Sequence, residues 1–278
     1  MPPRLYLYYL MTFVILNSCK KQESDLTDGD EKLYGITGNV QKGPFVNGSG
    51  ISIYELDNKF KPSGRTFHTT TESCGQFELI DISLISPYVE LVADGFYYDE
   101  IAGRLSNERL SLKALVDLSE QDNVNINVLT NLEYNRVKQL ISSEGLTIQE
   151  AKDQAIEEIL RIFKLDSFAI GNPESLDILN SGEGDAILLA VSAIIQGNQT
   201  TAELSKLLAD IVTDINDDGS LDDTLIQNTL LGQALTLNTD LIKQNLIEKY
   251  EELGININQI NNFDEYIEYF IMTIGNHE

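Results

Sequence analysis

The strongest strand signal in this chain lies in Pro87-Tyr-Val-Glu-Leu-Val-Ala-Asp-Gly-Phe-Tyr-Tyr98. Its apolar, β-branched and aromatic residues are the types that are enriched in strands. Asp94-Gly95 separates the run Val89–Val92 from the run Phe96–Tyr98, and an Asp-Gly pair between two such runs is a strong signal for a two-residue hairpin. The sequence therefore predicts an antiparallel hairpin that turns at Asp94-Gly95.

Short runs of the same kind continue on both sides of this hairpin, from Tyr34 to about Leu118. Glycine, proline, asparagine or aspartate separates each run from the next, as turns require. About seven short strands at this spacing are typical of a small antiparallel β-sandwich, which we expect over residues 34–118. The predicted strands are Gly35–Gln41, Gly50–Leu56, Arg65–Thr71, Gln76–Ile82, Tyr88–Ala93, Phe96–Ile101 and Leu110–Leu118.

After Asn123 the period of the apolar residues changes from two to that of a helix. Two capping boxes, Thr147-x-x-Glu150 and Thr200-x-x-Glu203, predict the starts of two helices. We therefore expect an all-α domain of about six or seven helices over residues 124–278, which makes the chain α+β in two parts. One face of the first helix carries Leu129, Leu132, Arg136-Val137, Leu140 and Ile141, and later helices fit residues 185–196, 201–215, 223–235, 240–253 and 264–273.

The N-terminus has the pattern of a secretory signal peptide. Arg4 precedes an apolar run from Leu5 to Leu16, and the run ends in Leu16-Asn-Ser-Cys19. The run is shorter than the roughly 20 residues that a membrane-spanning helix needs. A cysteine at the cut site resembles the signal of bacterial lipoproteins, in which Cys19 would be acylated and become the first residue of the mature chain. We expect a lipoprotein signal peptide over residues 1–18 and an acidic tether over residues 19–33.

Lipid on Cys19 would anchor the protein to a membrane without a spanning helix. The predicted location is the bacterial outer membrane, with the folded part at the cell surface or on the periplasmic face. The sequence does not indicate which leaflet of the membrane holds the anchor.

The charge of the chain is one-sided, with 44 acidic residues against 19 basic residues and a net charge of −25. Such a surface repels nucleic acid and anionic lipid headgroups, so neither is an expected partner. A cation, a basic protein or a neutral glycan suits it better. The acidic residues also keep a surface protein soluble, which is the simpler explanation of the charge.

The sequence contains no motif that marks a catalytic site. His68 lies in a predicted strand and His277 is the penultimate residue, and Cys74 has no neighbouring Lys, Arg or His that would lower its pKa. We therefore expect a protein that is not an enzyme. The alternative is an envelope hydrolase, or its accessory subunit, that acts through surface carboxylates such as Asp94, Asp99 or Glu100 near the aromatic strand.

One acidic loop resembles a calcium-binding EF-hand loop. Oxygen-bearing side chains recur along residues 214–223, Gly219 stands at position 6 and an aliphatic residue stands at position 8. Position 12, which usually supplies a bidentate glutamate, is Leu225, so any calcium affinity would be low. The alternative is a turn between helices, in which Gly219 ends one helix and Asp222 or Asp223 caps the next. No cofactor other than weakly bound calcium is expected, and its candidate ligands are Asp214, Asn216, Asp218, Ser220 and Asp222.

Four stretches together resemble a family of bacterial envelope lipoproteins of uncharacterised function, and the similarity covers most of residues 35–230. They are Gly38-Asn-Val-Gln-Lys-Gly-Pro-Phe-Val-Asn-Gly-Ser49, residues 87–98, Val124-Asn-Ile-Asn-Val-Leu-Thr130 and Gly184-Asp-Ala-Ile-Leu-Leu-Ala-Val191. The β part also resembles the carboxypeptidase regulatory-like (transthyretin-like) sandwich. The resemblance implies an envelope lipoprotein in two parts and supplies no catalytic residues.

These patterns together predict a lipid-anchored envelope lipoprotein that serves as a non-enzymatic binding or scaffolding module. Its expected partners are the membrane, through the lipid on Cys19, and a protein or glycan ligand. The alternatives are the envelope hydrolase and a structural protein that calcium stabilises weakly.

Overall fold

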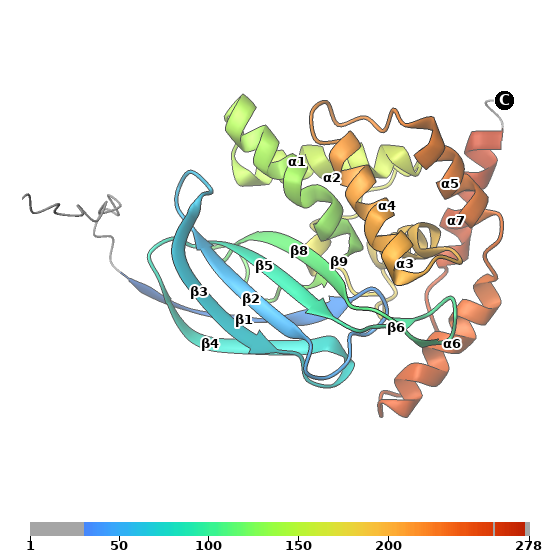
Figure 1. The fold of residues 1–278 in the computed structure, drawn as a ribbon, viewed down its shortest axis with the longest axis horizontal. Helices are drawn as coiled ribbons and strands as arrows, with labels where there is room; N and C mark the ends of the chain where they lie inside the picture. The colour runs from blue at the N-terminus through green and yellow to red at the C-terminus, as the bar shows by residue number, and fades with distance from the viewer. Residues whose placement is uncertain (1–30, 258, 276–278) are drawn as a thin grey trace, which may run out of the picture.

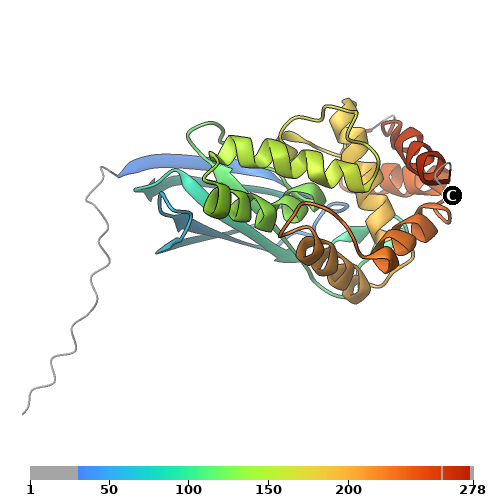
Figure 2. The same cartoon turned by 90° about the horizontal axis from the view of Figure 1, so that it is seen from above.

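The computed structural model describes residues 31–257 and 259–275 (Figure 1). Residues 32–127 form a β-rich region in which antiparallel pairing dominates, and the described residues after it form seven helices. The α+β class and the order of the two parts are therefore confirmed. The strands lie towards one end of the molecule and the helices towards the other (Figure 2).

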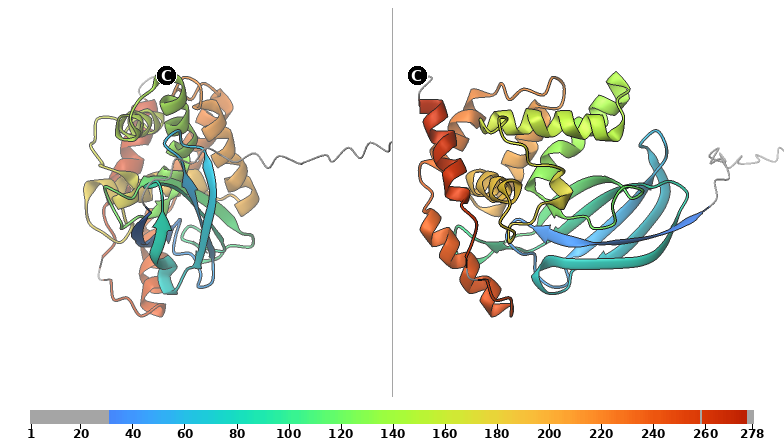
Figure 3. Two further views of the ribbon diagram at one scale, coloured as in Figure 1. Left: turned by 90° about the vertical axis from the view of Figure 1, so that its left-hand side faces the viewer. Right: turned by 180° about the vertical axis from the view of Figure 1, so that it is seen from behind.

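The first sheet has three strands in the order β4-β1-β9. The long strands β1 and β4 run antiparallel side by side (Figure 3), and the short strand β9 pairs parallel with the end of β1. β9 falls within the segment that is predicted to be helical, and β1 begins two residues before the predicted start of the β-sandwich at residue 34. The bounds are β1 Lys32–Gln41, β4 Gln76–Leu84 and β9 Ile126–Asn127.

The second sheet has four antiparallel strands in the order β3-β2-β5-β8. Along β5 buried residues alternate with half-buried ones, which is the pattern of a strand with one face on the core. The predicted strands in this region are confirmed to within a few residues. The bounds are β2 Gly50–Leu56, β3 Pro62–Thr70, β5 Tyr88–Gly95 and β8 Leu110–Asp117.

The hairpin predicted at Asp94-Gly95 is wrong. Both residues belong to β5, where Asp94 pairs with Gly50 and Ser111 and Gly95 pairs with Leu110. Neither residue has the positive φ that a type I′ turn requires. Gly95 is needed for a different reason, because a Cβ there would lie 2.0 Å from Ser49 Oγ. The chain instead turns later, between β6 (Tyr98–Asp99) and β7 (Arg104–Leu105).

The seven helices match the predicted segments closely. Thr147 and Thr200 each accept a hydrogen bond from the backbone of the glutamate three residues on, so both predicted capping boxes are confirmed. Among the described residues, no helix is both long enough and apolar enough to cross a membrane. The bounds are α1 Val128–Glu144, α2 Ile148–Ile162, α3 Glu183–Gln196, α4 Thr201–Asp214, α5 Thr224–Ala234, α6 Thr239–Glu252 and α7 Phe263–Gly275.

The β-rich region and the helices share one continuous hydrophobic core. Buried residues of both sheets, such as Ile36 and Leu91, belong to the same cluster as Ile187 of α3 and Phe270 of α7. Helix α1 lies against β8. A smaller second cluster joins Leu56 and Leu115 of the sheet to α1 and α2.

The two regions meet where residues 122–127 lie along β1. Thr37 N donates to Asp122 O at 2.9 Å, and Val124 N donates to Thr37 O at 2.7 Å. A Cβ on Gly38 would lie 1.9 Å from the carbonyl oxygen of Val124. Glycine at position 38 therefore permits the close approach of the two backbones.

Replacing Gly38 with alanine should lower the free energy of unfolding by about 3 kcal/mol, because backbone must move to admit the methyl group. Urea denaturation measures the change. Gly35→Ala in the same strand is the matched control, since the nearest atom to its Cβ would lie 4.0 Å away. Equal stabilities of the two variants would contradict this packing.

Candidate functional site

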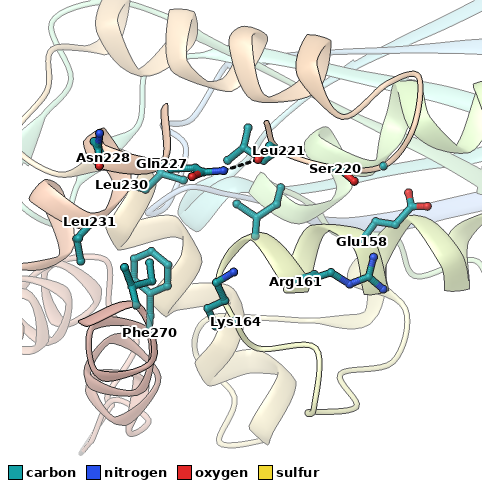
Figure 4. Close-up of a pocket in the computed structure, with 13 residues that line it drawn as sticks. Glu158, Arg161, Lys164, Ser220, Leu221, Gln227, Asn228, Leu230, Leu231 and Phe270 are labelled. Atoms are coloured by element: carbon teal, nitrogen blue, oxygen red, sulfur yellow. Dashed lines mark hydrogen bonds between the residues drawn. The ribbon is translucent and has the colours of Figure 1, made fainter. Parts of the chain in front are cut away.

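A pocket of about 380 Å³ opens between the C-terminal end of α2, the loop from α4 to α5, helix α5 and helix α7 (Figure 4). Its volume lies within the range of small-molecule sites. We call it the amphipathic pocket, because the charged side chains of Glu158 and Arg161 lie apart from its large apolar side chains. Its principal lining residues are Glu158, Arg161, Lys164, Leu221, Leu230 and Phe270.

The polar end of the amphipathic pocket depends on a buried ion pair. Arg136 of α1 donates from Nε to Glu158 Oε2 at 2.7 Å and from Nη2 to Glu158 Oε1 at 2.9 Å. Its Nη1 donates to the carbonyl oxygens of Asn216 and Asp217, at 3.3 Å and 2.9 Å. Arg136 thus fastens the α4–α5 loop to α1 and α2, and the hydrogen bonds to Glu158 raise the pKa of the guanidinium.

Two further cations stand at this pocket. Arg161 donates to Glu157 at 2.9 Å in an exposed pair one helical turn apart. Lys164 follows the end of α2, is exposed, and has no ion-pair partner among the described residues. Its φ of 59° lies in the left-handed region, which a lysine seldom adopts.

The other end of the amphipathic pocket is mainly apolar. Leu230 and Phe270 are almost fully buried, and Leu231 and Ile274 are half-buried beside them. Figure 4 shows Leu230, Leu231 and Phe270 towards one side of the pocket, together with the amide side chains of Gln227 and Asn228, and it shows Glu158 and Arg161 at the opposite side. This arrangement can hold a molecule that has an apolar body and one charged or polar end.

The predicted calcium loop forms one wall of this pocket through Gly219, Ser220 and Leu221. Asp214 Oδ2 accepts from the backbone of Asp222 at 2.6 Å, and Asp218 Oδ1 accepts from the backbone of Ser220 at 2.9 Å. These are the hydrogen bonds of a turn between helices.

The other features of the loop also fit the turn. Gly219 has a φ of 78°, and a Cβ there would lie 2.1 Å from the carboxyl carbon of Glu158. Asp223 caps α5, and Leu225 points to solvent with 74% of its surface exposed. Asn216 is half-buried and contributes its carbonyl oxygen to Arg136.

Across residues 31–257 and 259–275, no three His, Cys, Asp or Glu side chains lie close enough together to hold a metal ion. Calcium binding by Asp214, Asn216, Asp218, Ser220 and Asp222 stays a prediction.

The three carboxylates of the hydrolase alternative have separate partners. Asp94 forms an exposed ion pair with Arg109. Asp99 Oδ1 accepts from the backbone of Ile101 and Ala102, both at 3.0 Å. Glu100 is fully buried against Lys42, so its description as a surface carboxylate is wrong. The cause is the fold of the 96–100 segment, which pairs with the loop after β1 at Phe45 and contacts Asn245 of α6 instead of pairing with β5.

His68 is exposed on β3, as its strand position predicted. Its Nδ1 lies 3.1 Å from Ser52 Oγ across the β2–β3 pair, a neighbour that the sequence did not reveal. Cys74 is buried, and burial raises the pKa of its thiol, which keeps it in the unreactive form. Cys19 lies outside the described residues.

A second buried ionic cluster joins α1, α2 and the short 3₁₀ helix Pro173–Ser175. Lys152 Nζ donates to Glu133 Oε1 at 2.6 Å and also to Glu174 Oε1. We call these three residues the lysine triad. All three side chains are at most 5% exposed. Burial is the main cause that raises the pKa of Glu133 to about 8, and the neighbouring Glu174 raises it further.

Sequence reasoning missed the buried cations Lys42, Arg136 and Lys152. Arg136 left a signal, because it stands among apolar residues on the core face of the first predicted helix. Lys152 left one as well, because it has the same helical spacing as the apolar residues Ile148 and Ala155. Comparison with family models, with curated proteins and with solved structures finds no match to this chain.

The lysine triad predicts a pH dependence of stability. The pKa of Glu133 is raised from its ordinary 4.5 to about 8, so the folded state keeps a proton that the unfolded state releases. The stability that this retained proton contributes to the folded state is complete below about pH 4.5 and is lost as the pH rises through about 8. Glu133→Gln mimics the protonated carboxyl, so its melting temperature should rise relative to that of the parent protein between about pH 5 and pH 9.

Glu78→Gln is the matched control, because Glu78 is exposed on β4. Its melting temperature should follow that of the parent protein at every pH. If the melting temperatures of Glu133→Gln and the parent protein differ by the same amount at every pH, Glu133 does not keep a proton in the folded state.

Proposed function

We propose that the chain is a lipid-anchored bacterial envelope lipoprotein that acts as a non-enzymatic binding module. The anchor rests on the motif that ends in Cys19, and the envelope assignment also rests on the resemblance to lipoproteins of that class. The acidic segment after Cys19 would hold the folded part away from the bilayer.

The amphipathic pocket is the observation that carries the binding function. Its volume of about 380 Å³ suits a small ligand, and its charged end is separated from its apolar end. Glu158 is paired with Arg136 and Arg161 with Glu157, which leaves Lys164 as the lining cation without an ion-pair partner among the described residues. The ligand that fits is a molecule with an apolar body and an anionic group.

The proposal of a non-enzymatic role is supported by how the candidate carboxylates are engaged. Asp94 and Glu100 each form an ion pair with a basic side chain, and Asp99 accepts hydrogen bonds from two backbone amides of its own loop. A catalytic acid or base must come within hydrogen-bonding distance of its substrate, and each of these contacts occupies a carboxylate with another partner.

The β-rich region would serve as the scaffold, in the form of a transthyretin-like sandwich. The support is that both sheets contribute to one core, with Ile36 and Phe77 from the first and Ile53 and Leu91 from the second. Aligned sheets that bury their inner faces against one another are the basis of that architecture.

Octanoate should bind to the full chain in calorimetric titrations, and octylamine should bind less tightly. Lys164→Asn removes the unpaired cation and keeps a residue that tolerates the left-handed backbone. It should weaken octanoate binding about tenfold, the effect of one charge-assisted hydrogen bond.

The matched control is Lys59→Asn, which changes an exposed lysine outside the pocket. It should leave octanoate binding unchanged. Absence of octanoate binding, or equal affinity for the acid and the amine, would refute the proposed ligand class.

The anchor has its own test. When the chain is made in a bacterium that processes lipoproteins, the parent protein should incorporate labelled palmitate and partition into detergent. Cys19→Ala should abolish both properties, because no other residue can take the lipid at that position. Labelling of the variant, or a parent protein that stays in the aqueous phase, would show that Cys19 is not the anchor.

Protease treatment of intact and permeabilised cells would then show which face of the membrane carries the protein.

A further inference from the structure

A second pocket, of about 480 Å³, lies at the junction between the β-rich region and the helices. We call it the junction pocket, and it differs from the amphipathic pocket in every lining residue. The residues on which its chemistry depends are Phe60, Tyr88, Asp117, Glu120, Lys152 and Glu174.

One wall of the junction pocket is aromatic. The rings of Phe60 and Tyr88 lie with their centroids 4.6 Å apart and their planes tilted by 37°. Both side chains are only half-buried and pack at the edge of the smaller hydrophobic cluster. Their open faces can contact the apolar body of a ligand, and aromatic faces also attract cations.

The other walls carry more negative than positive charge. Asp117 is half-buried at the end of β8, where its Oδ1 accepts from the backbone and the hydroxyl of Ser119 and its Oδ2 stays available, and Glu120 is exposed in the segment that follows. Glu174 and Lys152 belong to the lysine triad, whose single ammonium is already shared with Glu133. The lining residues therefore hold three carboxylates and one cation, and that cation is engaged.

Glu174 gives a separate indication of a ligand. Its side chain is 1% exposed, and its Oε2 has no hydrogen-bond partner among the residues that the structure describes. Leaving a buried carboxylate oxygen without a donor is costly, so such atoms in folded proteins usually have an explanation. An ammonium group brings three donors and a compensating charge.

We propose that the junction pocket binds a small organic ammonium ligand. The ammonium group meets the acidic wall formed by Asp117, Glu120 and Glu174. The apolar or aromatic body lies against Phe60 and Tyr88. This site selects ligands of the opposite charge to those that suit the amphipathic pocket, and it stands independently of that pocket.

The test uses 2-phenylethylamine as the probe, with 2-phenylethanol and phenylacetate as neutral and anionic analogues of similar shape. Titration calorimetry on the full chain should show binding of the amine at least about tenfold tighter than binding of either analogue. Asp117→Asn and Glu174→Gln should each weaken amine binding, and the octanoate affinity of the same variants should not change.

Glu78→Gln removes one acidic charge from an exposed position outside the pocket, and it should leave amine binding unchanged. If Glu174→Gln does not fold, the double variant Asp117→Asn with Glu120→Gln provides the same test, because both residues lie at the solvent-facing rim of the pocket. The proposal fails if the three probes bind equally, if the amine does not bind, or if the rim double variant binds it as tightly as the parent protein does.

Discussion

The pairing of residues 122–127 with β1 is the constraint on which the rest of this structure depends. Val40 pairs with Ile126, and Asn39 N donates to the side chain of Asn125 at 2.9 Å. Asn127 then caps α1 through its side chain, so the first helix starts from a position that the sheet has already set. Because one hydrophobic core runs through both regions, the helices cannot move without disturbing the strands.

Helix α1 carries this constraint to both pockets. Arg136 holds the loop that lines the amphipathic pocket, and Glu133 stands in the lysine triad behind the junction pocket. Both residues are almost fully buried. Buried ion pairs add little net stability, since desolvation offsets much of their attraction, but loss of one partner leaves an uncompensated charge. Such pairs fix positions more than they strengthen the fold, and here they fix the walls of two cavities.

The helices could be predicted from sequence because their signals are local. Thr147 with Glu150 and Thr200 with Glu203 each satisfy helix-end donors within four residues, whatever the tertiary context. The hairpin at Asp94-Gly95 failed for the opposite reason: pairing with β2 and β8 on either side outweighed the local turn preference. The pockets were beyond prediction, since Glu158, Leu230 and Phe270 come from three helices that only tertiary packing brings together. The triad was hidden likewise: Lys152 has the helical spacing of Ile148 and Ala155 on the core face, but only tertiary packing brings Glu133 and Glu174 to it.

We propose that the amphipathic pocket takes a ligand with an apolar body and an anionic end. Hydrogen exchange of the full chain, with and without saturating octanoate, tests it most directly, because the exchange rates report where the ligand acts. Slower exchange should appear in residues 158–164, 219–231 and 270–274, which surround the pocket, and not in β2, β3 or β5. Unchanged exchange in those three segments under saturating octanoate would contradict the claim.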